Sequence, residues 1–228
     1  MGCRRIKIIH LVLAMVPVAM LLAVVARVRQ AHWTTCASAC ESSLFYIGAE
    51  LVNYRDRYGN FPPASVLDKK GKPMHSWRAI LYRELDHDFR QAYDFSKPWD
   101  SPANIVLADH PPRMFTCRNN QGEPARYTNY VALIDPHRSS ADYIHAQAPK
   151  HTKVGGILLI EYPNSHVRWT EPTDLSLDEL GSVSSGQDPG GIGVLFEDRT
   201  VRRVSKDELM RLLKPMGTED KRKSANTQ

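Results

Sequence analysis

The first thirty residues contain no acidic side chain, and the rest of the chain has no excess of either charge. Five of the 30 basic residues and none of the 25 acidic residues fall in residues 1–30, so residues 31–228 hold 25 of each. The pI of about 9.0 therefore reflects the N-terminal segment alone. A nucleic-acid-binding protein gathers positive charge on its folded domain, so we expect no nucleic-acid partner.

The chain also lacks the usual signatures of metal, phosphate and nucleophile chemistry. Its nine histidines form no HxH or HExxH pattern, which would be typical of a zinc site. The glycine-rich "GGIG" at 190–193 precedes an expected strand instead of a helix, which is the wrong context for a phosphate-binding loop. The serines of "GSVSSG" have no nucleophile-elbow context. From these patterns we expect no catalytic residue, no metal ligand and no cofactor.

What the N-terminal segment does have is a long apolar run. Residues 8–26 are apolar except for His10, which is about the length needed to cross the hydrocarbon of a membrane. Basic residues flank the run, three before it and two after it, which favours a cytoplasmic N-terminus with the bulk of the chain outside. We therefore predict a membrane anchor over 1–30. A cleaved signal peptide and a buried core helix remain the alternatives.

A second helix signal follows directly. Apolar residues recur from Cys36 to Tyr58 at spacings of three and four, which is one stripe of an α-helix. We expect this helix to continue from the membrane span, with a break near residues 30–35. Gly59 is placed to end it in the left-handed conformation, and two prolines after it prevent its resumption. The alternative is that "YRDRYGNFPP" at 54–63 forms a ligand site.

The remaining chain is mixed and rich in loops. "PMHSWRAILYRELD" predicts a short helix, "RMFTC" and "TNYVALI" predict short strands, and "GGILLIEY" predicts a central strand. Residues 194–204 predict a hairpin, and Ser205 with Glu208 has the spacing of a capping box before a last helix. We therefore expect one α+β domain over 31–213 with a small, mainly antiparallel sheet, followed by a disordered tail at 214–228.

These pieces resemble a bacterial family of prepilin-like proteins, domain-of-unknown-function family 1559, which also carries an H-x9-DG signature near its C-terminus. The resemblance covers residues 36–205 and rests on eight pieces in order, none specific alone. They include "CESSLFYIGAELVNYRDRYGNFPPA", "DKKGKPMHSWRAILYREL", "PWDSPAN", "WTEPTDL" and "GGIGVLFEDRTVRRV". The resemblance implies an α+β domain outside the inner membrane with a pilin-like N-terminal helix, and it implies no established activity.

Two features depart from the family pattern. The Gly-Phe pair and the glutamate of a prepilin leader are missing before and within the apolar run, which puts peptidase processing and pilus assembly in doubt. In the closing signature, Asp188 replaces the family histidine and Arg199 replaces the glycine after Asp198. An arginine in the left-handed region would cost about 1 kcal/mol, so we expect either a shifted turn or strain at Asp198.

The resemblance also implies a disulfide, because Cys40 and Cys117 match the two cysteine positions of the family. Such a bridge would be stable outside the cytoplasm and would tie the long helix to the "FTC" segment. Cys36 and Cys40 are a poorer pair, since two cysteines four residues apart on a helix seldom reach disulfide geometry. Three buried thiols remain the alternative.

Trp99 and Trp169 lie in proline-flanked loops, where they would form either an interaction patch or a cap on the edge of the core. We expect a membrane-anchored, pseudopilin-like structural or interaction protein, which meets a protein partner or a second copy through its N-terminal helix. One alternative is a cell-surface hydrolase using an acid pair such as Asp100 and Glu161. Another is a solute-binding module, which would need a deep apolar pocket.

Overall fold

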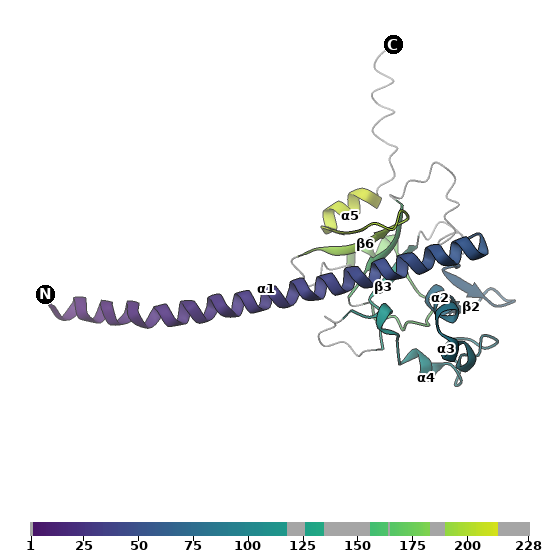
Figure 1. Ribbon diagram of the computed structural model, residues 1–228, viewed down its shortest axis with the longest axis horizontal. Helices are drawn as coiled ribbons and strands as arrows, with labels where there is room; N and C mark the ends of the chain where they lie inside the picture. The colour runs from purple at the N-terminus through teal and green to yellow at the C-terminus, as the bar shows by residue number, and fades with distance from the viewer. Residues whose placement is uncertain (1, 118–125, 135–155, 164, 183–189, 214–228) are drawn as a thin grey trace, which may run out of the picture.

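A computed structural model describes residues 2–117, 126–134, 156–163, 165–182 and 190–213. The chain begins with α1 (Gly2–Tyr58), a single helix of 57 residues that contains Pro17. At 1.5 Å per residue it extends for roughly 85 Å. Figure 1 shows its first half projecting away from the domain and its second half lying across it. The break expected near residues 30–35 is wrong, because α1 continues through this region.

The end of α1 follows the sequence prediction. Gly59 has a φ of 82° and donates its N–H to the carbonyl of Arg55 at 2.7 Å, which closes the last turn. Phe61 and Pro62 are then buried, so the chain leaves the helix toward the core. Its spacing predicted that Tyr58 would complete the apolar face of the helix, and this prediction is wrong. It is 48% exposed, and its hydroxyl donates to Glu84 at 2.7 Å.

A five-stranded sheet forms the centre of the domain, in the order β5-β3-β4-β6-β7. Its strands are β3 (Tyr130–Ile134), β4 (Ile157–Glu161), β5 (Leu175–Ser176), β6 (Ile192–Phe196) and β7 (Val201–Val204). β4 is central, as its continuous apolar run predicted. Three neighbouring pairs are antiparallel and the β3–β5 pair is parallel, so the sheet is small and mixed.

The sheet has a helix on each face. On β4, Leu159 belongs to the apolar cluster under α1, whereas Ile160 belongs to the cluster under α5 (Lys206–Leu213). This alternation is the two-residue period of a strand. α1 comes very close to β6, because a Cβ added to Gly48 would lie 2.7 Å from the Leu195 side chain. The stripe that α1 buries against the domain consists of Cys36, Cys40, Leu44, Ile47 and Leu51.

A second group of short elements packs beside the sheet, under the far end of α1 (Figure 1). It contains β1 (Ser65–Leu67) and β2 (Pro73–Ser76), which pair antiparallel, followed by α2 (Trp77–Leu85), α3 (His87–Ala92), α4 (Ile105–Ala108) and the 3₁₀ helix η1 (Arg113–Phe115). Another 3₁₀ helix, η3 (Leu177–Ser182), follows β5. The rings that fill this group are Trp77, Tyr82, Phe89, Phe115 and Trp169.

Two local predictions in this group are corrected. The helix expected over 73–86 begins only at Trp77, because Ser76 caps it by accepting the Ala79 N–H, and the residues before it form β2. The strand expected at 113–117 is instead η1, since the N–H of Phe115 donates to the carbonyl of Pro112 at 2.9 Å. A buried Phe115 is compatible with a strand and with a 3₁₀ helix, so the hydrophobic pattern of this short segment does not distinguish the two.

The C-terminal hairpin and helix match their predictions. β6 and β7 pair antiparallel, and Ser205 accepts the N–H of Glu208 at 3.1 Å at the start of α5. The expected alternatives of a shifted turn or strain at Asp198 are both wrong, because the turn keeps its position and Arg199 itself takes the positive φ, 69°. Asp198 accepts the N–H of Thr200 at 2.9 Å. Asp188 and the tail at 214–228 lie outside the described residues.

Candidate functional site

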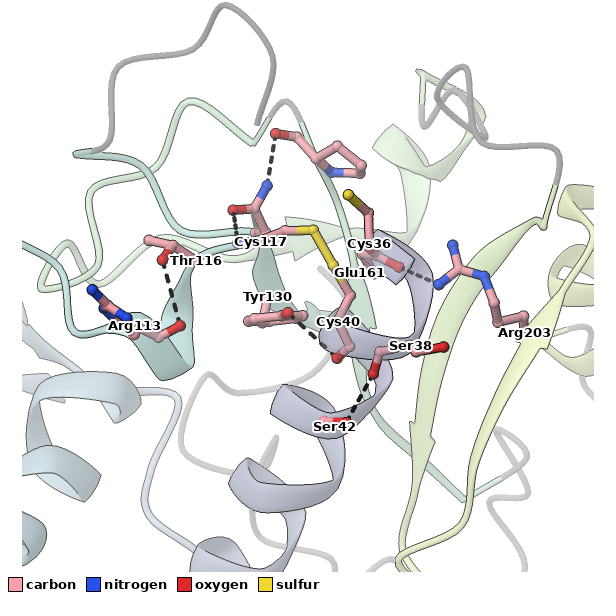
Figure 2. Close-up of a disulfide and its surroundings, with 12 residues drawn as sticks. Cys36, Ser38, Cys40, Ser42, Arg113, Thr116, Cys117, Tyr130, Glu161 and Arg203 are labelled. Carbon is pink, nitrogen blue, oxygen red and sulfur yellow. Dashed lines mark hydrogen bonds and ion pairs between the residues drawn. A yellow bond between two sulfur atoms is a disulfide. The ribbon is translucent and has the colours of Figure 1, made fainter. Parts of the chain in front are cut away.

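Cys40 on α1 and Cys117, two residues after η1, form a disulfide. Their Cα atoms lie 5.6 Å apart, and 77 positions of sequence separate them. The bridge implied by the family resemblance is therefore present, and it ties α1 to the segment that follows η1 (Figure 2). Cys36 is buried and keeps a free thiol, whose sulfur lies 3.7 Å from Nε2 of His32.

Tyr130, the first residue of β3, and Asn129, just before it, hold both cysteines by further hydrogen bonds. The Tyr130 hydroxyl donates to the carbonyl oxygen of Cys40 at 3.4 Å. The Asn129 side chain accepts the N–H of Cys117 at 2.7 Å. Burial raises the pKa of the Tyr130 phenol, and the nearby Glu161 carboxylate raises it further. Tyr130 is therefore a neutral hydrogen-bond donor in this junction at any ordinary pH.

Glu161 lies directly opposite Tyr130 in the β3–β4 register and faces the same junction. Its carboxylate accepts a hydrogen bond from Nη1 of Arg203 at 3.0 Å, and both side chains are largely buried. Arg203 also donates to the carbonyl oxygen of Gly191 at 2.6 Å. This acid is thus held in a buried ion pair between β4 and β7.

Asp100 has quite different surroundings. It is exposed in the turn after Trp99, beside the group of short helices, where its charge contributes to raising the pKa of Tyr93. Glu161 lies in the sheet under α1. The structure therefore does not bring the two acids into the paired arrangement that the hydrolase alternative requires.

A buried ion pair in the domain was not predicted from the sequence. Nη1 of Arg78, on α2, lies 2.7 Å from Oδ1 of Asp174, and the two side chains are 0% and 1% exposed. The same carboxylate oxygen accepts the indole N–H of Trp77 and the backbone N–H of Ala132. The guanidinium also donates to the carbonyl oxygens of Tyr130, Trp169, Glu171 and Thr173.

This cluster joins α2, β3 and the 168–174 loop. Burial raises the pKa of Asp174, and the Arg78 guanidinium opposes that effect. Because the guanidinium donates to backbone carbonyls as well as to the carboxylate, its role is to position the chain. The signal that could have revealed it was an arginine between two residues expected to face inward, Trp77 and Ile80.

The two tryptophans proposed as an interaction patch are separated by burial. Trp169 is 1% exposed, its ring stacks on Phe115 with centroids 5.8 Å apart, and its Nε1 donates to the Leu107 carbonyl at 2.8 Å. Trp99 is partly buried, and its backbone N–H donates to the Met74 carbonyl. Trp169 is therefore part of the aromatic core, and the predicted patch with Trp99 is wrong.

Two hollows on the domain bear on the ligand-binding alternatives. One, of about 220 Å³, lies between the end of α1 and α2. Arg57, on its wall, forms an ion pair with Glu84 at 3.2 Å, and Arg55 pairs with Asp56 at 3.0 Å, so the charges of the "YRDRYGNFPP" segment are already paired. The other, of about 210 Å³, lies beside β3 and β5. Both are smaller than the roughly 300 Å³ at which small-molecule pockets begin.

The projecting half of α1 is the remaining candidate for function. From Met15 to Val28 its large apolar side chains are 46–67% exposed, and no part of its most apolar stretch is buried against the domain. The helix is long and apolar enough, with a mean hydropathy of 1.2, to act as a membrane-spanning or signal anchor. The half of α1 after Cys36 packs on the sheet instead.

Comparisons of the chain with protein-family models, with curated proteins and with solved structures found no match. The family resemblance therefore stays an expectation that rests on the quoted sequence pieces.

Proposed function

We propose that this protein is a single-pass, membrane-anchored structural or interaction protein of pseudopilin type, with its α+β domain outside the cytoplasmic membrane. The observation that carries the proposal is the division of α1 into two halves on one continuous helix. From Met15 to Val28 its large apolar side chains are exposed, and after Cys36 it is a main packing element of the folded domain.

Hydrophobic burial explains why the first half needs a membrane. Exposing apolar surface to water costs roughly 25 cal/mol for each Å², and the domain covers none of this stretch. A bilayer removes that cost for every face of the helix at once, whereas a single partner groove would cover one face. Pro17 is compatible with a membrane helix because the side chains and carbonyls of such helices readjust locally.

The orientation follows from charge and from the disulfide. The basic cluster before the apolar run favours a cytoplasmic N-terminus by the positive-inside rule. The domain, on the other side, would then be in a compartment where the Cys40–Cys117 bridge persists. These two independent features agree on the same topology.

An interaction role is supported by the outer face of α1 within the domain. Phe45 is 59% exposed and Tyr46 is 48% exposed, on the side of the helix opposite the buried stripe. Two adjacent exposed rings, held on a rigid helix close to the membrane, suit contact with a protein partner or with a second copy of the chain. The separated acids and the small hollows give the enzyme and solute-binding alternatives no comparable support.

The topology is tested with a reporter that is active only outside the cytoplasm, fused after Gln228. The intact chain should give reporter activity in the membrane fraction, and deletion of residues 1–30 should abolish it. The matched control replaces residues 1–30 with a cleavable signal peptide, which should give soluble external activity. A silent reporter on the intact chain would overturn the proposed topology.

The interaction face is tested with a photo-cross-linking amino acid at Phe45, and at the exposed Asp88 on α3 as the control. Adducts that form at Phe45 and not at Asp88 support a partner on this face. The mass of the adduct distinguishes a second copy from another protein. Equal labelling at both positions, or none at either, contradicts the proposed face.

A further inference from the structure

Three side chains able to bind a soft metal ion converge where α1 meets the sheet. The sulfur atoms of Cys40 and Cys117 and a carboxylate oxygen of Glu161 all lie within 4.8 Å of one another. In the oxidised protein the two sulfurs are bonded to each other, so neither is a thiolate ligand. We propose that reduction of this disulfide converts Cys40, Cys117 and Glu161 into a binding site for one thiophilic divalent cation, such as Zn²⁺ or Cd²⁺.

The cysteines are held near each other by contacts that do not need the sulfur–sulfur bond. Tyr130 donates to the Cys40 carbonyl, and Asn129 accepts the Cys117 N–H. Tyr130 is also the register partner of Glu161 across the β3–β4 ladder. Two consecutive residues therefore set the backbone positions of all three ligands. When the bond opens, the two thiols and the carboxylate stay at one place in the fold.

Charge compensation favours a cation at this place. A buried charge is stable only when it is paired. In the oxidised protein the Glu161 carboxylate is paired with Arg203 at 3.0 Å. In the reduced, metal-bound form the two thiolates and the carboxylate carry three negative charges, which a divalent cation and Arg203 balance. The junction is therefore neutral in both states, and Arg203 remains beside the carboxylate as its second partner.

Reduction of the disulfide and binding of the cation are two separate steps. A dithiol reductant donates two electrons and two protons to the disulfide, and is itself oxidised to a disulfide. The sulfur–sulfur bond breaks and leaves two thiols. The cation then displaces the two thiol protons, because the thiolate is the ligand form. Metal–sulfur bonds of about 2.3 Å and a metal–oxygen bond of about 2.0–2.2 Å complete three positions, and water takes the fourth. This site does not depend on the membrane anchor.

The experiment uses full-length protein in detergent, in a Cys3→Ser/Cys36→Ser background that leaves only the two bridge cysteines. The protein is reduced with dithiothreitol, freed of reductant under argon and titrated with Cd²⁺. We expect one Cd²⁺ per reduced chain, with ultraviolet sulfur-to-cadmium charge-transfer absorption, and no such absorption from the oxidised chain. Glu161→Gln should weaken the affinity by at least about tenfold, as loss of a supporting ligand does. A large excess of Zn²⁺ should compete with Cd²⁺ for the site and lower this absorption.

Two controls make the outcome decisive. Cys36 is not part of the converging group, so restoring it should leave the affinity unchanged. Replacing Cys40 and Cys117 together by Ser should remove binding. The proposal is overturned if the reduced chain keeps its near-ultraviolet circular dichroism and binds no Cd²⁺, or if the double variant binds as well. Loss of that dichroism on reduction overturns it too, because the ligands are then not held in place without the bond.

Discussion

Arg78 and Asp174 form an ion pair of 2.7 Å that has no contact with solvent, although 96 positions separate them in the sequence. The pair connects α2 to the loop that precedes β5, and through Ala132 it also connects to β3. Buried ion pairs are not in themselves strongly stabilising, but removing one partner leaves an uncompensated charge. The pair therefore acts as a constraint on how the short helices dock against the sheet.

Replacing Arg78 with Met should lower the free energy of unfolding by about 3–5 kcal/mol, because it leaves Asp174 buried without its cation and five hydrogen bonds unmade. Urea denaturation followed by circular dichroism measures the change. The matched control is Arg83→Met on the same helix, whose partly exposed ion pair with Glu84 should contribute at most about 1 kcal/mol. Equal effects of the two substitutions would contradict the assigned role of Arg78.

The disulfide predicts a definite thiol count. The chain has four cysteines, of which Cys40 and Cys117 are bridged. Unreduced protein in denaturant should therefore react with two equivalents of iodoacetamide, and reduced protein with four. Cys117→Ser should lower the unfolding free energy by about 2–5 kcal/mol, because the bridge closes a long loop. Cys36→Ser is the control, and a loss as large as that of Cys117→Ser would show that the free thiol matters more than the bridge.

The parts of the fold that the sequence predicted are those in which neighbouring residues carry the signal. The stripe from Cys36 to Leu51 reflects a helix packed on one surface, and the continuous apolar run of β4 reflects a strand covered on both faces. Periodicity reads these directly. The Gly59 cap and the Ser205 capping box are equally local, and both are present.

The parts that the sequence did not predict depend on distant residues. Trp169 lies in the core because its ring stacks on Phe115 and its indole N–H donates to the Leu107 carbonyl. Arg78 is buried because Asp174 and four carbonyl groups converge on it. The continuity of α1 was not predicted either. The polar residues near 30–35 suggested a break, but polar side chains do not interrupt a helix where it projects from the domain. Glu161 was noticed as an acid, but its partner Arg203 lies on another strand.

Because of His75, we expect the folded protein to lose stability as the pH falls below about 6.5. Its ring is buried; Nε2 donates to the Phe95 carbonyl and Nδ1 accepts the Tyr93 hydroxyl, each at 3.0 Å, so the neutral ring satisfies both partners. Burial lowers the pKa of His75 from 6.5. Below the pKa of the unfolded chain, only the unfolded state takes up the proton, so stability falls with decreasing pH by at most about 1.4 kcal/mol per unit.

The measurement compares urea denaturation at pH 7.5 and 5.5 for three proteins. His75→Gln should lose less stability over this interval than the unaltered chain. His87→Gln, at a side chain that is 70% exposed, should lose as much as the unaltered chain does. Identical pH dependence of the unaltered chain and His75→Gln would show that other groups control the acid response.

Arg199→Gly should stabilise the protein by up to about 1 kcal/mol. Arg199 has a φ of 69°, in the left-handed region where a Cβ is unfavourable and glycine is not. The turn keeps its geometry through the Arg199 N–H to the Phe196 carbonyl, 2.9 Å, a bond that glycine also makes. The greater freedom of glycine in the unfolded chain subtracts part of the gain.

The control is Arg202→Gly, three residues on in β7, where extended backbone suits a side chain and the same substitution should destabilise by about 0.5–1 kcal/mol. A higher melting temperature for Arg199→Gly and a lower one for Arg202→Gly would locate the effect in the backbone conformation. A lower melting temperature for both variants would mean that the Arg199 side chain stabilises the fold by more than its strained backbone costs.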